Sequence, residues 1–145
     1  MQRIDNAGAL RAWLRGCPAI DPARPFGVDH LTPGAGGYAL CAAAGELKMR
    51  ENILGRVEPL SKQTQDYLFA VRGDNGADAA GGLESLALLQ AVAAWIRAQN
   101  AAGNLPARGD GRVTAALPVA YGAAVDFGAD TARYQMRIRV FYETD

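Results

Sequence analysis

Two stretches of the chain repeat hydrophobic residues at helical spacing. The first covers residues 3–16 and ends at Gly16. The second covers residues 79–101, where Asp78 is a suitable N-terminal cap and Gly103 a suitable C-terminal stop. The hydrophobic stripe of this second helix consists of Leu86, Leu88, Leu89, Val92, Ala93, Trp95 and Ile96. A stripe this wide predicts a helix that lies across a sheet with little exposed face.

Alternation of apolar and polar residues predicts strands elsewhere in the chain. The alternation is strictest over residues 133–142. The apolar positions of that segment are Tyr134, Met136, Ile138, Val140 and Tyr142. Residues 65–72 alternate in a similar way, and residues 38–43 form a short apolar run after several glycines. We therefore expect a strand at each of these three places.

Two further segments predict strands from less regular patterns. Ile53–Glu58 alternates loosely, and a turn after it would join it to the next strand, so residues 53–72 are expected to form a β-hairpin. Residues 113–121 also favour a strand, which 123–127 would extend. Because Pro118 has no N–H to donate, this strand is expected at an edge of the sheet or at a bulge.

Turn-forming residues separate these elements. Several prolines indicate an irregular connection over residues 17–36, and glycine and aspartate predict loops at 73–76 and 108–111. The tripeptides Arg72-Gly-Asp74 and Arg108-Gly-Asp110 are also found in adhesion ligands. Both copies fall where turns are expected, and turns favour Gly and Asp for backbone reasons. We interpret both tripeptides as turns.

The order of these elements predicts an α+β fold. We expect a mainly antiparallel sheet of four to five strands, with an N-terminal helix and one long helix packed on one face. No internal repeat or linker composition divides residues 1–145, so the chain is interpreted as a single domain.

Composition narrows the classes of partner. Lys plus Arg and Asp plus Glu both number 15, so the formal net charge is zero. Nucleic-acid-binding proteins usually carry a basic excess, and we expect no nucleic-acid specificity. No window reaches the length of about 20 apolar residues that a membrane helix needs, and the N-terminus is polar rather than signal-like. We expect a protein of the cytoplasm without membrane contact.

No catalytic, cofactor or metal site is predicted. Gly34–Gly37 follows no strand and precedes no lysine, so it does not match a phosphate-binding loop. Asp29 beside His30 is an acid–base pair in principle, but neighbouring loop residues usually diverge. Cys17 and Cys41 form no metal-binding motif. Two free thiols in a reducing compartment are expected, and a bridge between them is the alternative.

The charged residues offer candidates for contacts between subunits. The expected hairpin carries both signs of charge, which suits pairing with an identical neighbour. Its candidates are Arg56, Glu58, Lys62 and Asp66. Arg137 and Arg139 lie on the polar side of the last strand, where they would meet a neighbour's carboxylates, nucleic acid or only solvent.

The C-terminal half resembles a family of phage proteins. Trp95–Pro106 has the pattern W-I-x-x-Q-N-x-x-G-N-x-P, and Asp130-Thr-Ala-Arg-Tyr-Gln135 leads into the alternating strand. With Asp66–Arg72, these segments are similar to minor capsid or tail-terminator-like proteins of tailed phages and prophages. The similarity covers about residues 38–142. Gly81-Gly82, early in the long helix, departs from the family's pattern.

This resemblance implies a structural role without catalytic residues. Such subunits form a ring, expected to be a hexamer, on the head-proximal end of a long tail. The implied partners are copies of the chain, the tail-tube protein and a head-completion or neck protein. The implied locations are the host cytoplasm during assembly and then the tail or neck of the virion.

Three other interpretations remain open at this point. A head–tail joining protein of the neck would also form a ring. A small enzyme would use Asp29 and His30 with a distant carboxylate. A small-molecule-binding module would use the long helix and the sheet.

Overall fold

The computed structural model describes residues 6–29, 37–74, 80–127 and 131–144. It contains the helices α1 (Asn6–Leu14) and α2 (Ala80–Ala102). Its strands are β1 (Phe26–Val28), β2 (Tyr38–Ala42), β3 (Met49–Glu51), β4 (Val57–Pro59), β5 (Lys62–Asp74), β6 (Arg112–Phe127) and β7 (Thr131–Glu143).

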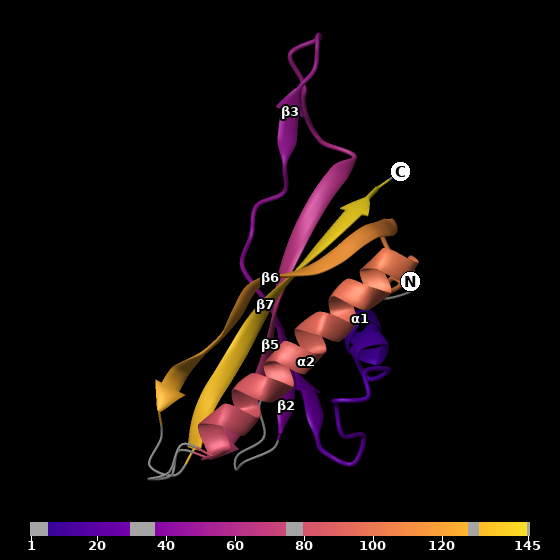
Figure 1. The fold of residues 1–145 in the computed structure, drawn as a ribbon. Helices are drawn as coiled ribbons and strands as arrows, with labels where there is room; N and C mark the ends of the chain where they lie inside the picture. The colour runs from indigo at the N-terminus through magenta and orange to yellow at the C-terminus, as the bar shows by residue number, and fades with distance from the viewer. Residues whose placement is uncertain (1–5, 30–36, 75–79, 128–130, 145) are drawn as a thin grey trace.

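Five strands form one sheet in the order β1-β2-β5-β7-β6. Only β1 and β2 pair in parallel, and the other neighbours are antiparallel. β3 and β4 form a separate two-stranded sheet, which projects beyond the main sheet in Figure 1. The predicted α+β fold, with a mainly antiparallel sheet, a short N-terminal helix and a long helix, is confirmed.

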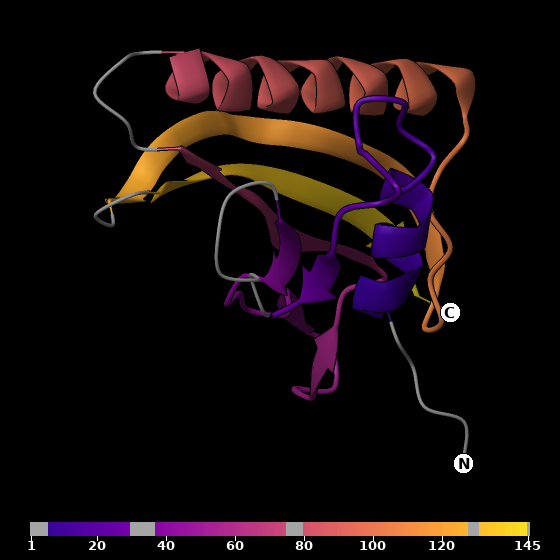
Figure 2. The ribbon, with the colours of Figure 1, turned by 90° about the horizontal axis from the view of Figure 1, so that it is seen from below.

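Both helices pack on the same face of the main sheet. Figure 2 shows α2 lying along the sheet as a second layer, with α1 at its side. The indole rings of Trp13 on α1 and Trp95 on α2 lie 4.9 Å apart between centroids. Leu10 and Leu14 of α1 belong to the same hydrophobic cluster as the buried residues of α2. The two helices and the sheet thus share one core.

The strand predicted with most regularity is observed as β7. Tyr134, Met136, Ile138 and Val140 are buried, whereas the residues between them are half-buried on the opposite face. This alternation follows from the two-residue period of a strand with one face on the core. The prediction for residues 133–142 is confirmed, and β7 extends it at both ends.

Helix α2 confirms the predicted position but not the predicted coverage. Its stripe is buried or half-buried as expected, and Gly103 ends it with a φ of 78°. The opposite side is exposed at Ala87, Gln90, Ala91 and Ala94, so the expectation of little exposed face is wrong. The helix covers a single layer of sheet, and nothing described covers its outer side. The proposed cap Asp78 lies outside the described residues.

Strand β6 is an edge strand, as Pro118 indicated. Residues 113–121 and 123–127 form one continuous strand, so the predicted extension is confirmed. Its pairing with β7 shifts register four times, and one shift lies between Pro118 and Ala120. The missing N–H is thus accommodated by bulging at the edge, where it breaks no inner ladder.

The predicted strand at Ile53–Glu58 is wrong over residues 53–56, which form a turn, whereas Val57 and Glu58 lie in β4. The side chain of Asn52 accepts hydrogen bonds from the N–H groups of Leu54 (2.9 Å) and Arg56 (3.1 Å), and Gly55 has a φ of 78°. These contacts form a tight turn between β3 and β4, because an Asn side chain competes with the strand ladder for backbone donors. The predicted hairpin 53–72 is therefore also wrong: β5 pairs with β2 and β7.

Two predicted irregular segments contain strand. Arg72 and Gly73 lie within β5 opposite Arg133 and Ala132, so this tripeptide is not a turn. The connection 17–36 contains β1, whose three residues pair with β2. The turn predicted at 108–111 is confirmed at Gly109 and Asp110. Short or glycine-containing strands are hard to predict from sequence patterns, because pairing with strands elsewhere in the chain determines whether they form.

The helix predicted over residues 3–16 is confirmed as α1, and residues 3–5 lie outside the described residues. The thiols of Cys17 and Cys41 are both free, as expected. Cys17 is buried, and burial raises the pKa of its thiol above the ordinary value. A raised pKa keeps this thiol protonated and unreactive at neutral pH.

We expect the substitution Gly73→Ala to destabilise the fold. A Cβ at this position would overlap the Ser85 hydroxyl of α2 and lie 3.4 Å from the Tyr134 ring. Overpacking of this kind costs about 1–3 kcal/mol, which chemical denaturation would measure. The double variant with Ser85→Ala should lose less than the two single variants together. Gly45→Ala, where the added Cβ meets nothing within 4 Å, is the control.

Candidate functional site

The acid–base pair considered from the sequence is only half described. Asp29 is exposed, has a φ of 59°, and donates its backbone N–H to the carbonyl of Leu40 at 2.9 Å. His30 and residues 34–36 of the glycine-rich segment lie outside the described residues. Within the described ranges, no group of three or more His, Cys, Asp or Glu is arranged to hold a metal ion.

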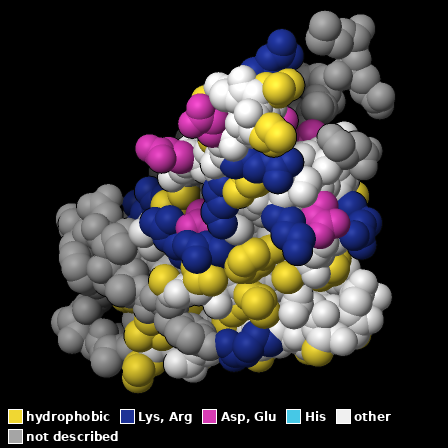
Figure 3. Space-filling view, turned by 90° about the horizontal axis from the view of Figure 1, so that it is seen from above, with side chains coloured by type: hydrophobic (Ala, Val, Ile, Leu, Met, Phe, Trp, Pro, Cys, Tyr) yellow, Lys and Arg dark blue, Asp and Glu magenta, His cyan; other side chains and the backbone are white. Residues whose placement is uncertain are grey.

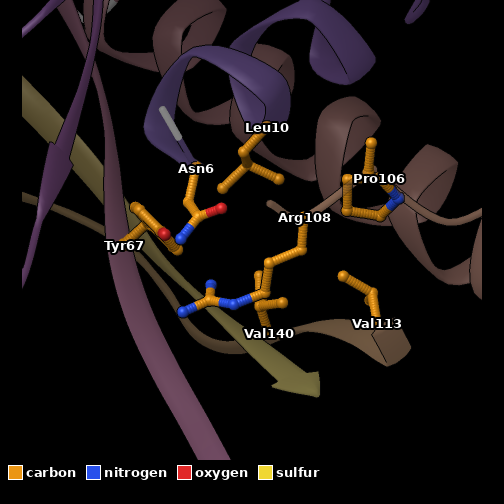
Figure 4. Close-up of a pocket in the computed structure, with 8 residues that line it drawn as sticks. Asn6, Leu10, Tyr67, Pro106, Arg108, Val113 and Val140 are labelled. Atoms are coloured by element: carbon orange, nitrogen blue, oxygen red, sulfur yellow. The ribbon is translucent and has the colours of Figure 1, made fainter. Parts of the chain in front are cut away.

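A narrow cavity lies between α1 and the ends of the strands (Figure 4). Its volume of about 10 Å³ is close to that of a single water site. Arg108 reaches across it and places its guanidinium 3.4 Å from the centroid of the Tyr142 ring. The side chain of Arg108 is 6% exposed and forms an ion pair with Asp110 at 2.6 Å.

Beside this cavity, hydrogen bonds connect the start of α1 to the loop before β6. The side chain of Asn6 accepts a hydrogen bond from Gly109 N–H (2.9 Å) and donates one to Asp110 (3.2 Å). Burial raises the pKa of the nearby Tyr67 hydroxyl above its ordinary value, although a hydrogen bond from Arg108 opposes this effect. The cavity is too small for a substrate, and its polar groups hold two parts of the chain together.

The projecting hairpin is the feature that most departs from an ordinary surface. We call residues 47–60 the arm; it contains β3, the Asn52 turn and β4 (Figure 1). Ile53 is 99% exposed and Leu54 is 78% exposed at its turn. The exposed large hydrophobic residues of the arm are Leu47, Met49, Ile53, Leu54 and Val57.

Exposure on this scale is unfavourable for an isolated arm. Among the described residues outside the arm, the exposed large hydrophobic side chains are those of Leu83 and Val119. Burying one such side chain is worth about 1.5–3 kcal/mol, and a two-stranded hairpin is marginally stable by itself. Clustered exposed hydrophobic residues usually mark a protein contact. The arm is therefore the main candidate for binding another protein.

One buried side chain holds the base of the arm on β5. The side-chain amide of Gln63, which is 3% exposed, accepts a hydrogen bond from Lys48 N–H (2.8 Å). It donates to the carbonyls of Lys48 (2.9 Å) and Leu60 (2.8 Å). The stem closes with Leu60 N–H on the Lys48 carbonyl at 2.9 Å. Gln63 thus replaces the backbone ladder that is missing between the arm and the sheet.

The charged candidates in the arm and at the adjoining start of β5 are exposed or already paired. Glu58 accepts a hydrogen bond from Arg50 across the hairpin at 3.0 Å. Arg56 lies beside the turn and is exposed, while Lys62 begins β5 opposite Glu143. Figure 3 shows basic side chains beside acidic ones at this end, with hydrophobic side chains between them. A role for Arg56, Glu58 and Lys62 between subunits remains a prediction.

The other three candidates meet within the chain on the outer face of the sheet. Arg139 donates to both carboxylate oxygens of Asp66 at 2.8 and 3.0 Å, and Arg137 donates to one at 3.0 Å. Hydrogen bonds from Arg139, with a smaller contribution from Arg137, hold the pKa of Asp66 below its ordinary value. The same contact raises the pKa of Arg139. One carboxylate therefore orients two guanidinium groups, whose pairing with a neighbour remains a prediction.

Sequence reasoning missed the two features that define the arm. The loose alternation over residues 53–58 predicts a strand, but it does not show that Ile53, Leu54 and Val57 are exposed. Gln63 carries no signal in the sequence, since its value depends on two carbonyls brought near it by the fold. An Asn three residues before a Gly, as at Asn52 and Gly55, was the available sign of a turn.

Comparison with protein-family models, with curated proteins and with solved structures gave no significant match. Among the described residues, no helix combines the length and the hydropathy that crossing a membrane requires.

We expect Asp66→Asn to lower the free energy of unfolding by roughly 1–2 kcal/mol near neutral pH, because two arginines lose a charged acceptor. The pKa of Asp66 is lowered in the folded state, so its contribution is present above the unfolded pKa of about 3.9 and is lost as the pH falls further. Denaturation curves of the two proteins should therefore converge in acid. Asp21→Asn, in an exposed pair at 3.6 Å, is the matched control with little effect. A difference that persists in acid would contradict this explanation.

We expect Gln63→Leu to loosen the arm without unfolding the sheet. Leucine has a similar size but cannot accept the Lys48 N–H or donate to the two carbonyls. Hydrogen exchange of the Lys48 amide should accelerate by about tenfold or more, while amides in the centre of β5 and β7 stay protected. Unchanged exchange at Lys48 would show that another contact holds the arm.

Proposed function

We propose that this chain is a ring-forming structural subunit of a tailed virion, acting as a tail terminator. The arm with its exposed hydrophobic residues is the observation that carries the proposal. The resemblance of residues 38–142 to tail-terminator-like proteins supplies the kind of assembly. In this role the chain works by binding neighbours, and we propose no catalytic activity or cofactor for it.

A ring needs a contact that joins one surface of a subunit to a different surface of the next. The arm suits this requirement because it extends away from the core of its own subunit. Its hydrophobic side chains therefore bury little of their surface against the rest of the chain. In this contact Ile53 and Leu54, at the turn of the arm, would pack against the adjacent subunit. An interface centred on two or more such side chains would be stabilised mainly by the hydrophobic effect.

The edges of the main sheet favour the arm over strand pairing as the contact. Strand β6 forms one edge, where Pro118 and several register shifts interrupt the row of free backbone groups. The other edge, β1, has three residues. Short or bulged edges resist the addition of a further strand. Ring contacts in this proposal therefore use side chains of the arm rather than a continuous sheet.

The proposed partners follow from the position of a terminator in the particle. Copies of the chain form the ring, expected to be a hexamer, on the end of the tail tube, and a head-completion or neck protein binds its other side. The ring forms in the host cytoplasm during assembly and stays in the virion.

We expect Ile53→Ser combined with Leu54→Ser to abolish ring formation. Both side chains are largely exposed, so the thermal midpoint should change by no more than a few degrees. Native mass spectrometry and light scattering at high concentration, with and without tail-tube protein, would measure assembly. Leu83→Ser is the control, since Leu83 is 65% exposed but lies outside the arm.

Two outcomes would count against this function. Normal rings from the double variant would remove the arm from the contact. A wild-type protein that binds a head-completion protein, but neither caps tail tubes nor limits their length in electron micrographs, would indicate a neck subunit instead.

A further inference from the structure

The outer face of β7 carries a row of guanidinium groups that the arm does not use. Because Tyr134, Met136 and Ile138 point into the core, the residues between them point to the face without helices. We call Arg133, Arg137 and Arg139 the arginine row; all three are half-buried. Gln135 lies between the first two on the same face.

The hydrogen-bond donors of this row are only partly satisfied within the described residues. Arg137 and Arg139 share the single carboxylate of Asp66 through three hydrogen bonds. Arg133 lies between Arg72 of β5 and Asp126 of β6 in the two ladders, and its Nε atom is buried without a hydrogen-bond partner among the described residues. A buried donor without an acceptor is unfavourable. A bound carboxylate would supply the missing acceptor.

The spacing of the row matches an extended chain. Residues of a strand advance about 3.4 Å each, so Arg137 and Arg139 are about 7 Å apart along β7, and Arg133 and Arg137 about 14 Å. An extended peptide repeats its side chains on one face with the same period. Acidic residues at the first, third and seventh positions of such a peptide, running antiparallel to β7, would therefore align with Arg139, Arg137 and Arg133.

We propose that the arginine row binds an extended acidic segment of a partner protein. Each guanidinium offers a planar set of donors that fits a carboxylate, and Asp66 holds two of them in place. Leu68 and Phe141 are half-buried on the same face and add apolar contact beside the row. Arginine with neighbouring apolar side chains is typical of interfaces between proteins.

The same observations favour a protein partner over nucleic acid. The chain as a whole has no basic excess, which nucleic-acid affinity usually requires. The row is also separate from the arm: Arg133 lies opposite Arg72, ten residues along β5 from Lys62, where the arm joins the sheet. Binding at the row thus does not depend on the proposed ring contact.

Fluorescence anisotropy with a labelled peptide would test the proposal on the full chain. The probe is a serine-threonine peptide with glutamate at its first, third and seventh positions. We expect Arg133→Gln to weaken its binding roughly tenfold, the loss for one charge-assisted contact. Arg56→Gln, which removes the same charge from the arm, is the matched control and should bind as the wild type does. Binding should also weaken as salt is raised.

Each of the remaining measurements has a decisive outcome. A peptide with its three glutamates adjacent should bind more weakly, and equal binding would overturn the alignment with the row. Equal affinity of the wild type and Arg133→Gln, at unchanged thermal midpoint, would overturn the site. Tighter binding of an oligothymidylate than of the peptide would assign the row to nucleic acid. The arm variant with Ile53→Ser and Leu54→Ser should still bind the peptide, so failure here is distinct from failure of the proposed ring.

Discussion

The pairing of β5 with β7 is the interaction on which the rest of the structure depends. Their ladder runs without a register shift from Lys62 opposite Glu143 to Asp74 opposite Thr131. Each strand has a further neighbour, so this pair lies at the centre of the sheet. A long unbroken ladder aligns every second side chain on one face, which separates the core residues from the polar ones.

Both candidate surfaces are consequences of this central pair. At one end of β5, the buried amide of Gln63 receives the base of the arm. On the outer face, the antiparallel register places Asp66 directly opposite Arg139, and one carboxylate then orients two arginines. Buried or half-buried polar groups are held in one arrangement by their hydrogen bonds, because any arrangement that leaves them unpaired is unfavourable. The same ladder therefore determines where the arm stands and how the arginines face.

Periodic elements were predictable because local physics determines them. The stripe of α2 and the alternation of β7 each need only one buried face, and Pro118 correctly placed β6 at an edge because proline lacks a donor wherever it lies. The outer side of α2 was predicted wrongly for the complementary reason. Ala87 and Ala91 are compatible with burial or exposure, and only the number of layers in the fold decides between them.

The sequence by itself determined which segments become helix or long strand, since the period of burial is written in consecutive residues. Tertiary structure alone decided what contacts what: that β5 pairs with β7 rather than with residues 53–58, that Gln63 meets two carbonyls of the arm, and that Asp66 meets Arg137 and Arg139. Most of these contacts join residues far apart in the chain, and their energies depend on distances that no local pattern encodes. The exposure of the arm was also decided by tertiary structure, because a hydrophobic residue in a sequence does not indicate whether the molecule has a surface to cover it.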